Sequence, residues 1–248
     1  MKGEVQPMPF LHAAGVALAV ALLGILAFYG LRPALEEQGL DQYSAYFYSL
    51  SSVFIVLILW TALAYVREGG ARSPRAFLRR TRMDHFRLAV IPWSIAVGLL
   101  MLLPTLLFSP LTARLVTMGL LPLPSGLPDY LDPSALQSLP ELRAQLVSSP
   151  ALALIPIILV LNILSEEMFW RGMILPRQEL VHREMTFLVH GSLWALTHVF
   201  QYWLLLPILV GSIALSFGVQ RTKNTWVGVI GHAINNALPL AILIFVVP

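Results

Sequence analysis

Long apolar runs separated by short polar segments dominate the pattern of this chain. Most of the runs have the roughly 20 residues that an α-helix needs to span the hydrocarbon core of a bilayer. They occupy residues 10–32, 44–66, 87–108, 151–175, 187–203, 204–219 and 225–247. The stretch from 187 to 219 is continuously apolar and too long for one crossing, so we divide it into two runs near Trp203 and Pro207. The pattern predicts an all-α, polytopic membrane helical bundle with about seven transmembrane helices.

Composition supports a membrane protein and excludes several kinds of site. Hydrophobic residues make up 57% of the 248 residues and charged residues only 12%, which is far more apolar than a soluble domain. The chain contains no cysteine, so disulfides, thiolate metal ligands and a cysteine nucleophile are excluded. Lys2 precedes the first run, but no clear small-residue cleavage site follows. We therefore interpret residues 10–32 as an anchor rather than a signal peptide.

Basic residues are distributed unevenly between alternate loops. Short cytoplasmic loops collect Lys and Arg, and with the N-terminus inside, thirteen basic residues fall on the cytoplasmic side and three outside. This predicts a cytoplasmic N-terminus, an external C-terminus and an integral protein of the bacterial inner membrane. The positive charge then reflects topology, and no nucleic-acid partner is expected. The cytoplasmic set is Lys2, Arg67, Arg72, Arg75, Arg79, Arg80, Arg82, Arg87, Arg171, Arg177, Arg183, Arg221 and Lys223, and the external set is Arg32, Arg114 and Arg143.

Two adjacent carboxylates, Glu166 and Glu167, follow the apolar run 151–160. Ionisable groups at such depth cost on the order of 2.5–3.5 kcal/mol each and usually mark a functional site. A helical rotation of about 100° per residue places Glu167 on the same face as Arg171, in the favourable orientation for an ion pair. Glu166 instead shares its face with Asn162 and Trp170. One carboxylate therefore has a predicted partner, and the other is available for chemistry.

Further polar groups occur in later apolar segments, namely His198, His232 and Asn236. His232 and Asn236 are four residues apart and share a helical face. A single intramembrane histidine is weak evidence, because such residues are often satisfied by hydrogen bonds within a bundle. Together with Glu166 they place four polar groups on three helices, and we expect them to converge on one site.

The ordered set Glu-Glu-x-x-x-Arg, aromatic-x-x-x-His and His-x-x-x-Asn resembles the CPBP family of intramembrane proteases. This family includes CAAX prenyl endopeptidases and bacteriocin-processing or self-immunity proteins, and it usually has Phe where this chain has Trp. The resemblance covers about residues 150–247. It implies an endopeptidase that cleaves a membrane-associated or lipid-modified protein. The residues that carry it are Glu166, Glu167, Arg171, Trp194, His198, His232 and Asn236.

Peptide hydrolysis needs an activated water and donors for the developing oxyanion, and the resemblance suggests a role for each group. Glu166 is the general base, His198 orients the same water, and His232 with Asn236 donates to the oxyanion. Glu167 and Arg171 support the fourth helix. Asn162, Trp194 and Asn235 are candidates for side chains that orient the catalytic groups. We expect no metal, although zinc held by Glu166, His198 and His232 is an open alternative.

The same motifs leave other functions open. A family member without proteolysis could act as a scaffold or immunity protein that binds a peptide or lipid partner. A proton-coupled transporter also uses intramembrane Glu and His, but we find none of the related halves with broken helices that transporters show. The expected partners are membrane lipids and a membrane-associated peptide or protein substrate. Because Glu166 comes late in its apolar run, the predicted site faces the cytoplasm.

The chain is divided into three regions on these grounds. Residues 1–110 form a three-helix membrane region with a basic cytoplasmic loop at 67–86, and residues 111–150 form an external loop. The stretch from 109 to 150 contains seven prolines. Residues 151–248 form the catalytic four-helix membrane core. In the basic loop, Ser73-Pro74 resembles an N-cap followed by a first-turn proline, which predicts a short interfacial helix; a solvated loop is equally compatible.

Overall fold

The computed structural model describes residues 5–124, 127–128, 131–134 and 139–247, and within these ranges it contains helices and no strand. Six segments are long and apolar enough to cross a membrane: Phe10–Glu37, Gln42–Arg67, Val90–Thr117, Pro150–Leu196, Val199–Thr222 and Trp226–Phe245. The predicted all-helical, membrane-spanning architecture is confirmed. The number of seven crossings and the orientation of the termini stay predictions. Lys2 and parts of the predicted external loop lie outside the described residues.

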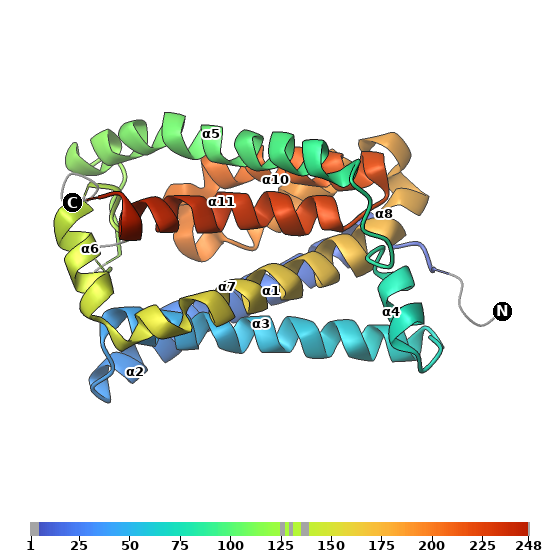
Figure 1. Ribbon diagram of the computed structural model, residues 1–248, viewed down its shortest axis with the longest axis horizontal. Helices are drawn as coiled ribbons and strands as arrows, with labels where there is room; N and C mark the ends of the chain where they lie inside the picture. The colour runs from blue at the N-terminus through green and yellow to red at the C-terminus, as the bar shows by residue number, and fades with distance from the viewer. Residues whose placement is uncertain (1–4, 125–126, 129–130, 135–138, 248) are drawn as a thin grey trace.

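The first half of the chain supplies three of these segments. Helix α1 (Phe10–Ile25) continues through a π-helical turn (Leu26–Leu31) into α2 (Arg32–Glu37). Asp41 precedes helix α3 (Gln42–Arg67). Its carboxylate accepts hydrogen bonds from the backbone N–H groups of Tyr43 and Ser44 and so caps the helix. The short α4 (Pro74–Arg80) is followed by α5 (Val90–Thr117), which packs along α10 and α11 (Figure 1).

The second half begins with α6 (Leu139–Ser148), which lies across one end of the bundle (Figure 1). A 3-10 turn leads into α7 (Ile155–Glu166), which continues without interruption through a π-helical segment (Glu167–Ile174) into α8 (Leu175–His182). Arg183, with φ of 51°, ends this long helix. A second 3-10 turn (Arg183–Met185) then reverses the chain into α9 (Thr186–Leu196), so the longest apolar segment consists of two packed pieces.

The apolar stretch after residue 187 is broken close to its predicted division. A 3-10 segment (Val199–Leu204) contains Gln201 in a non-helical conformation, with φ of −120° and ψ of 53°. It separates α9 from α10 (Leu205–Thr222). The two helices pack closely at Gly191, where an added Cβ would lie 2.8 Å from the Cα of Ile213. The side chain of Gln220 donates to the carbonyl of Arg183 at 2.8 Å, so the end of α10 returns to the start of α9.

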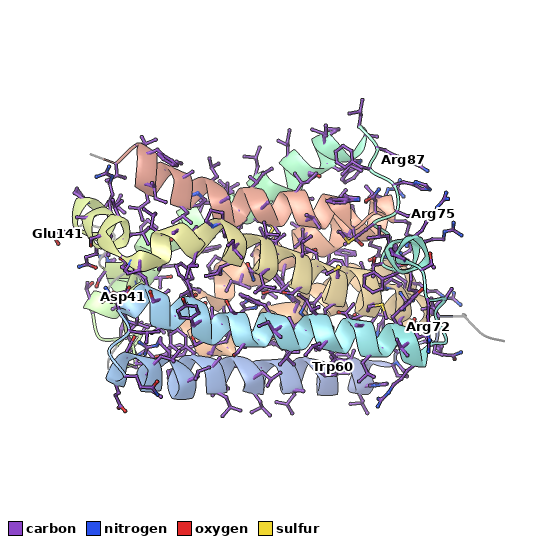
Figure 2. All side chains as sticks on the ribbon, turned by 60° about the horizontal axis from the view of Figure 1, so that its bottom comes forward. Asp41, Trp60, Arg72, Arg75, Arg87 and Glu141 are labelled. Carbon is purple, nitrogen blue, oxygen red and sulfur yellow. The ribbon has the colours of Figure 1, made fainter. Side chains whose placement is uncertain are left out.

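The outer surface of the bundle is apolar, and its two ends differ in charge. Leu18, Leu59 and Leu106 are 60%, 64% and 68% exposed, as expected for side chains that face lipid. Figure 2 shows three arginines at one end, which we call the basic end, and two acidic residues at the other, the acidic end. Helix α1 begins at the basic end, and α11 (Trp226–Phe245) finishes at the acidic end (Figure 1). The labelled residues are Arg72, Arg75, Arg87, Asp41 and Glu141.

The predicted short helix in the basic loop is confirmed as α4, although Ser73 makes no side-chain cap hydrogen bond. Arg80 at its end donates to both carboxylate oxygens of Glu68, at 2.7 and 2.8 Å, and to the carbonyl of Gly172 at 2.9 Å. Arg177 of α8 donates to the same carboxylate. Glu68 therefore ties the basic loop and α3 to the long helix that carries Glu166.

This cluster predicts acid sensitivity. Burial alone would raise the pKa of Glu68, but the hydrogen bonds and charges of Arg80 and Arg177 outweigh it and hold the pKa below its ordinary value of 4.5. A depressed carboxyl pKa contributes stability above the ordinary value, and this contribution is lost as the pH falls through the depressed pKa. We expect Glu68→Gln to lower the melting temperature at pH 7, with a smaller difference from the parent near pH 3. A constant difference across this range would contradict the prediction.

Candidate active site

Glu166 lies at the end of α7, where both of its oxygens accept hydrogen bonds. Asn162, one turn earlier, donates to Oε1 at 2.9 Å, which agrees with the predicted shared face. The indole Nε1 of Trp194 in α9 donates to Oε2 at 3.0 Å. Glu166 is only 7% exposed, and these two donors satisfy a carboxylate that would otherwise be costly to bury.

The neighbouring Glu167 opens the π-helical segment and is fully buried. Its Oε1 accepts from Arg171 Nη1 at 3.2 Å, which confirms the predicted ion pair. The same oxygen also lies 3.0 Å from Nδ1 of His232 in α11, a contact that the sequence pattern did not reveal. Gly228 makes room for this arrangement, because a Cβ there would collide with the Glu167 carboxylate. Glu167 therefore holds a histidine of the predicted site as well as its own helix.

Trp194 occupies the centre of the constellation. Its ring centroid lies 4.9 Å from that of His198 and 5.7 Å from that of His232, both in edge contacts. The guanidinium of Arg171 lies 4.2 Å from the centroid of the indole ring, within the range of a cation–π interaction. A Phe at this position could keep the stacking but not the hydrogen bond to Glu166. The aromatic exchange noted in the sequence thus supplies a donor to the predicted base.

His198 follows α9 directly, at the point where the helix ends. Its Nδ1 lies 3.1 Å from the carbonyl of Trp194. Because a carbonyl can only accept, Nδ1 carries the proton and Nε2 of the neutral ring is left with a lone pair. The break between α9 and the 3-10 segment therefore fixes both the position and the tautomer of this imidazole.

An amide chain links α11 to Glu166. Asn235 donates to Oδ1 of Asn236 at 2.9 Å, and Asn236 donates to Oδ1 of Asn162 at 3.0 Å. Asn162 in turn donates to Glu166. Asn236 has two N–H groups, so the second one is available to another acceptor. Asn162, Trp194 and Asn235, the predicted orienting residues, all take part in this network.

These groups line one cavity of about 630 Å³, a volume typical of ligand pockets. Glu166, His198, His232 and Asn236 all contribute to its wall, so the structure brings the four predicted residues together from α7, the α9 end and α11. Gln201 also lines it and donates to the Tyr46 hydroxyl at 3.3 Å. Sequence periodicity offered no signal for Tyr46, because it lies among the other aromatic residues at the start of α3, Tyr43, Phe47 and Tyr48.

The expectation that the site faces the cytoplasm stays a prediction. Glu166 lies six residues before Gly172, whose carbonyl accepts a hydrogen bond from Arg80 of the basic loop at 2.9 Å. The long helix continues beyond residue 175 to His182. At a rise of 1.5 Å per residue, Glu166 lies about 16 Å from Ile155 and about 24 Å from His182. The predicted apolar run ends at residue 175, but the helix itself is longer, because the charged and polar residues of α8 belong to it. Cavity-lining residues also come from α6 at the acidic end.

The alternative zinc site would use Glu166, His198 and His232 as its donors. In the part of the chain that the structure describes, no group of three or more His, Asp or Glu side chains is positioned to hold a metal ion. The oxygens of Glu166 already accept from an amide and an indole, and His232 Nδ1 faces Glu167. The absence of a metal stays a prediction, and no catalytic step is assigned to a metal.

Comparison with known families agrees with this constellation. Residues 148–238 match the family model described as Type II CAAX prenyl endopeptidase Rce1-like. This part of the chain is similar to the CAAX protease family. The matched region begins at α6 and ends in α11, so it contains Glu166, Glu167, His198, His232 and Asn236, while α1 to α5 lie outside it. No curated protein and no solved structure matches the chain.

Proposed function

We propose that this integral membrane protein is an intramembrane endopeptidase that hydrolyses a peptide bond in a membrane-associated or lipid-modified protein. The observation that carries the proposal is the single cavity lined by Glu166, His198, His232 and Asn236. Similarity to the CAAX protease family in the same region supports it. A hydrolytic site needs a base, a positioned water and oxyanion donors, and these four side chains can provide them.

In the proposed mechanism, Glu166 and His198 act on the attacking water. Glu166 removes a proton as the water oxygen bonds to the scissile carbonyl carbon. The Nε2 lone pair of His198 accepts the hydrogen bond from the remaining O–H and holds the water in line. The tetrahedral intermediate then collapses as the proton moves from Glu166 to the departing amide nitrogen, which breaks the C–N bond and releases an amine and a carboxylic acid; the acid then loses its remaining proton to water. Asn162 and Trp194 keep Glu166 in one orientation throughout.

The oxyanion would form beside α11. Asn236 donates from the N–H that is not used by Asn162. The Nδ1 of His232 faces the buried Glu167 carboxylate, and the ring would donate to the oxyanion from Nε2 when both of its nitrogens carry a proton. Glu167 thus orients His232 and balances its charge. Arg171 holds the Glu167 carboxylate from the other side through their ion pair.

Cleavage by the purified protein tests this function. The protein in lipid vesicles should cleave membrane-associated peptides, and a strain expressing an inactive Glu166 variant should accumulate the uncut substrate among its membrane proteins. A chelator series examines the metal alternative, since a metal-independent enzyme keeps its rate. Tight capture of an uncleaved partner by both the parent and the Glu166 variant would instead establish a scaffold or immunity protein.

The proposed topology places the basic end in the cytoplasm of a bacterial cell, the side on which Lys and Arg accumulate. The opposite positions of the two chain ends are consistent with an odd number of crossings (Figure 1). Because the chain has no cysteine, a single introduced cysteine is the only thiol, and its labelling reports the side of the membrane on which it lies. In intact cells, a membrane-impermeant maleimide should label Glu141→Cys and leave Arg72→Cys unlabelled until the membrane is opened. The reverse pattern would invert the topology.

A further inference from the structure

The cavity that holds Glu166 is polar at one end and apolar at the other. Around the α9 end and α11 its wall carries the carboxylate, imidazole and amide groups described above. Towards the acidic end the wall is formed by apolar side chains of α6, α7 and α11. These are Leu139, Leu142, Leu146, Ile155, Leu159 and Leu243. A ligand that fills both parts must have an amide at one end and an apolar chain at the other.

Helix α6 covers the apolar end of this cavity. It crosses the acidic end of the bundle in Figure 1, and its inward-facing Leu142 and Leu146 are only 4% and 2% exposed. Although they belong to the wall of a cavity, these leucines are withdrawn from solvent. Leu139, at the start of α6 and also part of the wall, is 38% exposed, so a route past Leu142 and Leu146 requires α6 to move.

Side-chain contacts hold α6 in place from both flanks. Gln42 of α3 donates to Gln145 of α6 at 3.1 Å, and Arg143 of α6 donates to the carbonyl of Ile244 at the end of α11, also at 3.1 Å. Just beyond α6, Ser149 donates to Asp41 at 2.7 Å. The contact between Gln42 and Gln145 is exposed, where exchange with water costs little, and the other two are partly buried. Such a fastening can open without unfolding the bundle.

We propose that the apolar part of the substrate enters from the acidic end beneath α6, occupies the α6-lined half of the cavity and so presents its amide to Glu166. The inference rests on the proposed function and names the substrate's side of entry and chemistry. With the topology given above, it means that the substrate is taken from the exported leaflet. The apolar chain can be an acyl group or a run of apolar side chains, and the two are compared below.

Occupancy is tested without any need for proteolysis. A palmitoyl amide that carries a diazirine should, after illumination in vesicles, label residues of α6, α7 and α11 that line the cavity. Leu159→Trp should reduce this labelling severalfold by filling the apolar half. Leu106→Trp, on the exposed outer surface, is the matched control and should leave it unchanged. Labelling confined to the outer surface of the bundle, equal in all three proteins, would overturn the proposal.

Movement of α6 is tested with a reversible tether. In Gln42→Cys/Gln145→Cys, a reducible bis-methanethiosulfonate linker joins α3 to α6, and no other cysteine competes. We expect the tether to lower both photolabelling and peptide cleavage at least tenfold, with recovery after reduction. The control tether, Glu184→Cys/Gln220→Cys, joins neighbouring segments at the basic end and should have no effect. Unchanged labelling and cleavage with α6 tethered would show that entry does not pass beneath it.

A third comparison identifies the source of the apolar chain. One peptide carries an acyl group, and its partner carries a run of leucines in the same place. Competition of either peptide with the photoprobe identifies the occupant. Competition by neither peptide would overturn the assignment of this half of the cavity to the substrate. If the photoprobe occupies the cavity but no peptide is cleaved, the proposed function fails while the binding site stands; cleavage without occupancy gives the opposite result.

Discussion

Replacing Glu166 by Gln should lower kcat/KM for peptide cleavage by about 10²–10⁴-fold, the usual contribution of a general base. The amide keeps the size of the carboxylate and can still accept from Trp194, but it cannot take a proton from water. We expect His198→Ala to cause a loss in the same range. Rates are measured in vesicles with a peptide that the parent cleaves. Thermal unfolding of each variant establishes that the protein is folded.

Two further variants make this result specific. Glu184→Gln removes an exposed carboxylate and should leave cleavage unchanged. Trp194→Phe keeps the aromatic contacts but removes the donor to Glu166, so a smaller loss is expected. The same ring is contacted by Arg171, His198 and His232, which are unchanged in this variant. Full activity of Glu166→Gln would reject the assigned base.

The second large effect concerns stability. Arg171→Met should destabilise the protein by about 3–5 kcal/mol, because it leaves the fully buried Glu167 without its cation. Glu167→Gln combined with Arg171→Met should be more stable than Arg171→Met alone, since the stranded charge is then gone. Equilibrium unfolding in mixed micelles measures both differences.

A control variant distinguishes the cost of burying an unpaired carboxylate from the cost of losing an exposed ion pair. Arg79 is 70% exposed and lies 3.9 Å from Asp84, a geometry worth less than about 1 kcal/mol. Arg79→Met should therefore have little effect. If Arg171→Met were equally mild, or if the double variant were no more stable than Arg171→Met, the burial of an unpaired carboxylate would not be the cause.

The sequence by itself determined the kind of protein and most of the site. Apolar runs of bilayer length require helices, because only a helix satisfies its own backbone hydrogen bonds in lipid. The i,i+4 relations are local, so Glu167 with Arg171 and Glu166 with Asn162 followed from helical spacing alone and are present in the structure. The motif order also indicated the family whose model the chain matches.

Tertiary packing decided what local spacing cannot specify. The contact of Glu167 with His232 depends on how α7 meets α11, and the donor from Trp194 depends on where α9 ends. The α7–α8 helix continues past the predicted run to His182, since polar residues extend a helix that an apolar pattern terminates. The cavity beneath α6 exists only because helices distant in sequence leave space between them, and no periodicity in one segment encodes that space.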